Sequence, residues 1–195
     1  MPHYYDEEQE GPFVPYRIEV AARGQHLGIW SAKGIFSKDE LDQGTKLLID
    51  TCVLSPGWNV HDLGCGNGVV GIIIKKAEPT CRVLCSDVSK RAVELAQKNA
   101  GEHAPDIMVR HSDGYGRIPE VFDTVLFNPP YVAGRETIYR LIDEAHEHLR
   151  PGGLLQLVAR HNKGGETLKK RLIAVFGNCD DTRRASGFRL YVAQK

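Results

Sequence analysis

The stretch HDLGCGNG, residues 61–68, decides the fold of this chain. It follows a strand-like segment at residues 59–63 and opens a helix-like segment at residues 69–76. Glycines in such a turn let the backbone bend sharply and approach a ligand without obstruction by a Cβ atom. Because this kind of turn is typical of nucleotide-binding α/β folds, it predicts a ligand site at the carboxyl end of the first central strand.

Strand-like and helix-like segments alternate from residue 59 onward, which indicates a parallel sheet covered by helices on both faces. We therefore predict an α/β, Rossmann-like, doubly wound fold with a mostly parallel seven-stranded sheet. Strands are expected at residues 59–63, 82–88, 106–111, 122–127 and 154–159, and helices at residues 69–76, 89–100, 137–149 and 166–176. The last two strands, residues 179–184 and 188–193, are expected to form an antiparallel hairpin.

The N-terminal part differs in character. Residues 1–16 are acidic and contain prolines and a glycine, which predicts an extended or mobile lead-in. Residues 17–22 and 27–30 flank a glycine-containing turn and predict a short hairpin. A capping box from Ser37 to Glu40 predicts a helix that ends before Pro56. We expect residues 17–195 to form a single domain.

Composition and charge exclude several classes of protein. The 195 residues contain no apolar run of 18, and the acidic start is unlike a secretory signal, so we expect a cytoplasmic protein without a membrane span. Five cysteines without a CxxC pair predict neither a disulfide framework nor a metal site. Residues 150–195 hold ten basic and three acidic side chains, which suits either a solvated surface or contact with a polyanion.

Acidic residues also stand at the ends of the next two strands. Asp87, followed by Val88, is placed to accept hydrogen bonds from both ribose hydroxyls of an adenosine. Asp113, followed by Gly114, is placed either to accept a hydrogen bond from the adenine amino group or to cap a loop. These positions predict an adenosine-containing cofactor.

Two cofactors fit the glycine-rich stretch. Residues 66–71 match the GxGxxG pattern of nicotinamide-binding folds. The order D-x-G-x-G-x-G at residues 62–68, however, resembles methyltransferases that use S-adenosylmethionine, in which a carboxylate suits the cationic sulfonium. That resemblance implies S-adenosylmethionine as the cofactor, with these contacts expected: Asp62, Gly64, Cys65, Gly66, Asn67, Gly68, Asp87, Val88, Asp113, Gly114 and Asn128.

The motif that carries the chemistry is Asn128-Pro129-Pro130-Tyr131, directly after the strand at residues 122–127. Two prolines after a strand fix the backbone and the direction of its carbonyl groups. The motif resembles class I methyltransferases that act on planar nitrogens. The resemblance implies that the Asn128 side-chain oxygen and the Pro129 carbonyl accept the two N–H bonds of an amine, while Tyr131 stacks on a flat base.

Residues 33–37 and 41–48, KGIFS and LDQGTKLL, further resemble the methyltransferase small domain family. The family includes ribosomal RNA guanine-N2 methyltransferases and compact archaeal relatives, and the resemblance covers residues 28–195. It implies that Phe36, Gly44 and Thr45 close over the cofactor. A core position for Phe36 and close helix packing at Gly44 are the structural alternatives.

The sequence thus predicts an S-adenosylmethionine-dependent N-methyltransferase acting on an exocyclic amine of a base in RNA, with guanine N2 of ribosomal RNA implied by the resemblance. The alternatives are a protein glutamine methyltransferase, in which the same four-residue motif is common, and a cofactor-binding module without turnover. No protein partner is indicated. Contacts to the RNA substrate are expected from Tyr131, Arg135, Arg160, Lys163, Arg183 and Arg184.

Overall fold

A computed structural model describes residues 13–35 and 41–195. Its central sheet has the strand order β5-β4-β3-β6-β7-β9-β8. The strands are β3 (Asn59–Leu63), β4 (Arg82–Asp87), β5 (Met108–His111), β6 (Phe122–Phe127), β7 (Leu149–Arg160), β8 (Asp180–Ala185) and β9 (Phe188–Gln194). The first five pair in parallel, whereas β9 pairs antiparallel with both β7 and β8. The predicted fold class is confirmed.

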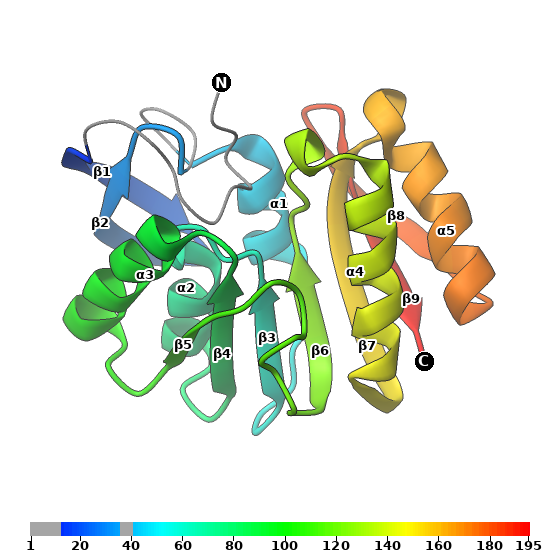
Figure 1. The fold of residues 1–195 in the computed structure, drawn as a ribbon, viewed down its shortest axis with the longest axis horizontal. Coiled ribbons are helices and arrows are strands. Elements are labelled where there is room, and N and C mark those ends of the chain that lie inside the picture. Colours follow the sequence, from blue (N-terminus) through cyan, green and yellow to red (C-terminus); the bar gives the residue numbers. More distant parts are fainter. Residues whose placement is uncertain (1–12, 36–40) are drawn as a thin grey trace.

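Helices cover both faces of this sheet. They are α1 (Gln43–Thr51), α2 (Val69–Ala77), α3 (Lys90–His103), α4 (Arg135–Glu147) and α5 (Glu166–Phe176), with short helical turns at Tyr131–Ala133 and His161–Gly165. One hydrophobic core joins α1, α2 and α3 to one sheet face, and a second joins α4 and α5 to the other. In Figure 1 the parallel strands point toward the upper edge of the sheet, where α1 also lies.

Most predicted elements lie within a few residues of their observed bounds. The strands at residues 59–63 and 122–127 and the helix at residues 166–176 are confirmed without change. The fifth predicted strand is longer than expected, since β7 begins at Leu149. The N-terminal hairpin is formed by β1 (Pro15–Ala22) and β2 (Gln25–Ala32), so the last two residues of the predicted lead-in belong to a strand.

The first helix was predicted incorrectly at both ends. Asp42 caps α1, accepting hydrogen bonds from the backbone N–H groups of Gly44 and Thr45 at 2.9 and 3.1 Å. The predicted capping box at residues 37–40 lies outside the described residues. The helix that was expected to follow it begins at Gln43. The helix ends at Thr51, several residues before the expected stop.

A tertiary contact explains the early end of α1. The buried amide of Gln156 on β7 accepts a hydrogen bond from Val53 N and donates one to Val53 O, at 2.8 and 2.7 Å. These bonds satisfy backbone groups that a longer helix would otherwise use internally. They also fix α1 beside β7, at the edge of the sheet where the site lies.

Candidate active site

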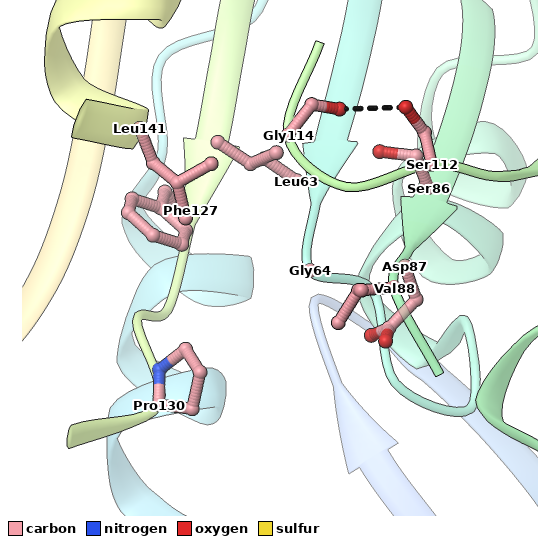
Figure 2. Close-up of a pocket in the computed structure, with 10 residues that line it drawn as sticks. All are labelled: Leu63, Gly64, Ser86, Asp87, Val88, Ser112, Gly114, Phe127, Pro130 and Leu141. Atoms are coloured by element: carbon pink, nitrogen blue, oxygen red, sulfur yellow. Dashed lines mark hydrogen bonds between the residues drawn. The ribbon is translucent and has the colours of Figure 1, made fainter. Parts of the chain in front are cut away.

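The carboxyl ends of β3, β4 and β6 meet at one edge of the sheet, because β3 lies between the other two. Ligands of open α/β sheets bind in the crevice at such a point. Figure 2 shows a hollow there, which we call the strand-end hollow. It is lined by Leu63, Gly64, Ser86, Asp87, Val88, Ser112, Gly114, Phe127, Pro130 and Leu141.

The glycine-rich turn is held in place by its neighbours. Gly66 has a φ of 56° and donates its N–H to a carboxylate oxygen of Asp87 at 2.9 Å. Gly68 has a φ of 81°, and a Cβ atom there would lie 3.1 Å from the Cβ of Ala96 on α3. Both positions therefore require glycine for conformation, and the second also for close packing. Of the turn residues, Gly64 itself lines the strand-end hollow.

Asp87 occupies the position predicted for the ribose-binding acid. Its carboxylate lies in the wall of the strand-end hollow and also accepts the N–H of Ser89 at 2.8 Å. Burial raises the pKa of Asp87, while the two backbone hydrogen bonds oppose this shift. Because each carboxylate oxygen has two acceptor sites, Asp87 retains capacity for a ligand's hydroxyl groups.

Five of the predicted cofactor contacts are buried and do not line the strand-end hollow: Asp62, Cys65, Gly66, Asn67 and Gly68. The Asp62 carboxylate accepts the N–H of Gly71 at 3.0 Å and thereby ties β3 to α2. The Asn67 side-chain oxygen accepts the N–H of Val69, and its backbone oxygen accepts a hydrogen bond from Asn99. In this structure these residues support the conformation of the glycine-rich turn from its buried side.

The buried Asp62 gives a pH-dependent stability. Burial raises the pKa of Asp62 to about 7, so the folded state favours the neutral acid. This contribution to stability is complete below the unfolded pKa of about 4 and is lost as the pH rises through 7. We expect urea unfolding to show that Asp62→Asn gains up to about 4 kcal/mol relative to the wild type between pH 4 and pH 8.

Asp62→Asn is compared with the wild type because His61 also contributes to the pH dependence of stability. Burial lowers the pKa of His61 to about 3, so its contribution to stability rises with pH and opposes that of Asp62. The surface variant Asp50→Asn serves as the control and should show no such gain. A difference between Asp62→Asn and the wild type that stays constant with pH would contradict the assignment.

The cofactor contact expected of Asp113 stays a prediction. Its carboxylate forms an ion pair with Arg140 of α4 at 2.7 Å and is not among the residues that line the strand-end hollow. Its neighbours Ser112 and Gly114 line the hollow instead, and the Ser112 hydroxyl donates to the Gly114 carbonyl at 2.9 Å, as Figure 2 shows. Sequence reasoning could not find this pairing, because 27 residues separate the two partners.

Asn128 opens onto a second hollow, which we call the Asn128 hollow. It is lined by Asp42, Asn128, Pro129, Pro130, Arg160, Lys163 and Phe188. Pro130 lines both this hollow and the strand-end hollow, so the two adjoin at the motif. A ligand in one hollow and an amine in the other would therefore meet beside Asn128. The side chain of Tyr131 is not described.

The N-terminal segment reaches Asn128 through Thr45. The Asn128 side-chain nitrogen donates to the Thr45 hydroxyl at 2.8 Å, and that hydroxyl donates to Asp42. A Cβ atom on Gly44 would lie 2.7 Å from the ring of Phe188, so this glycine permits Phe188 to pack on the helix cap. Neither Gly44 nor Thr45 lines the strand-end hollow, and the cofactor contact expected of them stays a prediction. Phe36 lies outside the described residues.

The predicted basic residues do not lie at one place in the structure. Arg160 and Lys163 line the Asn128 hollow, and the Arg160 guanidinium lies 4.8 Å from the centre of the Phe188 ring. Arg184 lines a neighbouring hollow, the hairpin hollow, with His161, Asn162, Ala185, Ser186, Gly187, Phe188 and Arg189. Arg135 instead lines a separate hollow beside α5, and Arg183 lines none of these.

Sequence reasoning missed Asp42 and Phe188 as site residues. Asp42 stands in the segment of the predicted first helix and Phe188 in a predicted hairpin strand, and neither has a local signal for a site beyond the capping preference of aspartate. Phe188 is shared by the Asn128 hollow and the hairpin hollow. It therefore forms a wall common to both.

The fold and the adjoining hollows define a class I, Rossmann-like methyltransferase architecture, and comparison with known proteins places the chain within it. The methyltransferase small domain model matches residues 26–192. The chain belongs to the methyltransferase small domain family.

Curated relatives carry the name ribosomal RNA small subunit methyltransferase C. The protein from Pseudomonas entomophila is 34% identical over 183 residues, covering 92% of this chain and 54% of the relative. The protein from Haemophilus influenzae strain PittGG is 40% identical over 139 residues, covering 69% of this chain and 42% of the relative. The chain thus spans about half the length of the curated relatives it matches.

Solved structures show the same fold at lower sequence identity. A 16S rRNA guanine-N2 methyltransferase from T. thermophilus, in complex with AdoMet and guanosine, aligns with a TM-score of 0.78 at 21% identity, covering 94% of this chain and 51% of that one. A methyltransferase from Pyrococcus furiosus aligns with a TM-score of 0.64 at 24% identity, covering 73% of this chain and 76% of that one. Among the described residues, no helix has the length and apolar character of a membrane span.

Proposed function

We propose that this chain transfers a methyl group from S-adenosylmethionine to an exocyclic amine of a base in RNA, with guanine N2 of small-subunit ribosomal RNA as the target. The observation that carries the proposal is the junction of the strand-end hollow and the Asn128 hollow at Pro130. The names of the curated relatives support the choice of RNA and ribosome. Such a substrate would place the protein in the cytoplasm.

The residues that line the strand-end hollow suit the chemistry of the proposed cofactor. Asp87 provides acceptor sites for the ribose hydroxyls, and Gly64 allows close approach because it has no Cβ atom. Leu63, Phe127 and Leu141 provide apolar surface for a flat ring, and Figure 2 shows them apart from Asp87. S-Adenosylmethionine, when bound, supplies a methyl group activated by the sulfonium leaving group.

The chain's own residues position the amine. The Asn128 side-chain oxygen and the Pro129 carbonyl accept its two N–H bonds, which fixes the direction of the nitrogen lone pair. Positive charge develops on the nitrogen during the transfer, and these two acceptors stabilise it. Most of the rate enhancement then comes from alignment, a contribution that reaches about 7–11 kcal/mol in favourable cases.

The proposed function is tested by transfer of labelled methyl groups from S-adenosylmethionine into RNA and protein from cells that lack this gene. We expect label in small-subunit ribosomal RNA, recovered after nuclease digestion as N2-methylguanosine. Label in the amide of a protein glutamine would favour the alternative substrate. Cofactor binding without any label would indicate a binding module.

We expect RNA affinity to depend on Lys163 and Arg184, which line neighbouring hollows. Each phosphate contact contributes about −0.7 to the slope of log K against log salt for single-stranded RNA. Lys163→Ala and Arg184→Ala should each make the slope less steep by about this amount in a binding titration from 50 to 300 mM salt. Arg135→Ala should change it less, because Arg135 lies at a separate hollow.

Lys170→Ala is the matched control, since Lys170 is highly exposed on α5 and lies 3.8 Å from Glu166. Its slope should equal that of the wild type. A salt slope unchanged by both Lys163→Ala and Arg184→Ala would count against RNA binding over this surface.

A further inference from the structure

Three polar side chains link the helix cap of α1 to Asn128. Asp42 accepts two backbone N–H groups and the hydroxyl proton of Thr45, while the Asn128 nitrogen donates to the Thr45 oxygen at 2.8 Å. Thr45 is fully buried and Asp42 lines the Asn128 hollow. The three residues therefore form one continuous chain of hydrogen bonds that ends at the site.

The direction of these hydrogen bonds is fixed by the carboxylate. A threonine hydroxyl has one proton and two acceptor sites, and an ionised carboxylate accepts only. Because the Thr45 proton is donated to Asp42, the Thr45 oxygen faces Asn128 as an acceptor. Asn128 must then present its nitrogen to Thr45, which leaves its oxygen for the Asn128 hollow.

We propose that Asp42 and Thr45 are positioning residues that set the orientation of the Asn128 amide, so that its oxygen rather than its nitrogen meets the substrate amine. The inference rests on the proposed function for its consequence in catalysis. An isolated asparagine amide would rotate between two orientations of similar shape. In one of them the amide NH2 group would face the N–H groups of the substrate amine, so that two hydrogen-bond donors would meet. The hydrogen-bonded chain removes that orientation.

The chain also polarises the amide in the useful direction. Hydrogen bonds that run in series strengthen one another, so the negative charge of Asp42 increases the acceptor strength of the Asn128 oxygen. The amine becomes more positive during methyl transfer, and a stronger acceptor stabilises that change. This explains why Asp42 and Thr45 stand in one helix cap, where the backbone N–H groups of Gly44 and Thr45 hold the carboxylate.

Asp42→Asn tests the direction of the hydrogen bonds. An asparagine at this position retains an oxygen for the cap, but its nitrogen would donate to Thr45. The Thr45 proton would then turn to Asn128 and reverse its amide. We expect kcat to fall about 100-fold, with KM for RNA and the dissociation constant for S-adenosylmethionine within threefold of the wild type.

Thr45→Val and Thr45→Ser separate the hydroxyl from the shape of the side chain. Thr45→Val should lose most of the turnover, whereas Thr45→Ser, which keeps the hydroxyl, should recover most of that loss. Asp50→Asn is the matched control, because Asp50 lies on the same helix and pairs on the surface with Lys46. Its kcat should equal that of the wild type.

The nitrogen resonance of the Asn128 side chain provides a readout that does not depend on activity. It should shift in Asp42→Asn and in Thr45→Val but not in Asp50→Asn, in 15N-labelled protein without RNA. An unchanged resonance in Thr45→Val would overturn the proposal, as would a kcat of Asp42→Asn within threefold of the wild type. If the wild type methylates protein instead of RNA, the proposed RNA function fails while the resonance shifts still support the orienting role.

Discussion

We expect Asn128→Ala to lower the rate of methyl transfer by about 100- to 1000-fold, the loss typical of removing one preorganised group that stabilises developing charge. S-Adenosylmethionine affinity should change by less than threefold, because Asn128 does not line the strand-end hollow. A contact of Asn128 with the cofactor, which the sequence also predicts, stays a prediction. Single-turnover transfer to RNA measures the rate, and calorimetric titration measures the affinity.

Asn178→Ala is the matched control for Asn128→Ala. Asn178 is an exposed asparagine that bonds to the backbone of Gln194, far along the chain from the motif. It should transfer methyl groups at the wild-type rate. A rate of Asn128→Ala within fivefold of the wild type would show that the amide does not orient the amine.

The central sheet was predictable because its signals are local. Short strand-like segments alternate with helix-like ones, and the turns after β3 and β6 contain residues that cannot continue a strand, three glycines and two prolines. Neighbouring parallel strands run in the same direction, so their carboxyl ends lie at the same edge of the sheet. The positions of Asp87 and Asn128 at one edge therefore followed from the order of segments, without any knowledge of side-chain contacts.

The corrections arise where distant residues compete with a local signal. Two capping residues, Ser37 and Asp42, precede the first helix, and in the structure Asp42 caps it while also bonding Thr45. Gln156, about a hundred residues later, fixes the chain just after the helix. No pattern within the segment itself reports these partners.

The same reason limits prediction of the site. The Asp42, Thr45 and Asn128 side chains form one hydrogen-bonded chain although 83 residues separate the last two. Asp113 follows β5 by two residues, whereas Asp87 is the last residue of β4, and the Asp113 carboxylate pairs with Arg140. Sequence placed both acids at the correct edge, whereas only the three-dimensional contacts distinguish their roles.

We expect Asp87→Ala to weaken binding of S-adenosylmethionine at least tenfold, a loss of about 1.4 kcal/mol or more. Charge-assisted hydrogen bonds contribute about 1.5–3 kcal/mol each, and Asp87 is placed to accept them from the ribose hydroxyls. The variant also removes the acceptor that holds the Gly66 N–H, so the turn loses a support. Calorimetric titration of the purified chain measures the affinity, with NAD as a comparison ligand.

Asp113→Ala is the control that makes this test specific, because it removes an acid from the next strand end. Its carboxylate is 2.7 Å from the Arg140 guanidinium and is more than half exposed, so the variant should bind S-adenosylmethionine within threefold of the wild type. An equal loss in both variants would mean that Asp113 leaves its ion pair to contact the cofactor. Unchanged affinity in Asp87→Ala would contradict the assignment of S-adenosylmethionine to the strand-end hollow. Tight binding of NAD by the wild type would also contradict it, because the acid at the end of β4 can bind the ribose of either cofactor.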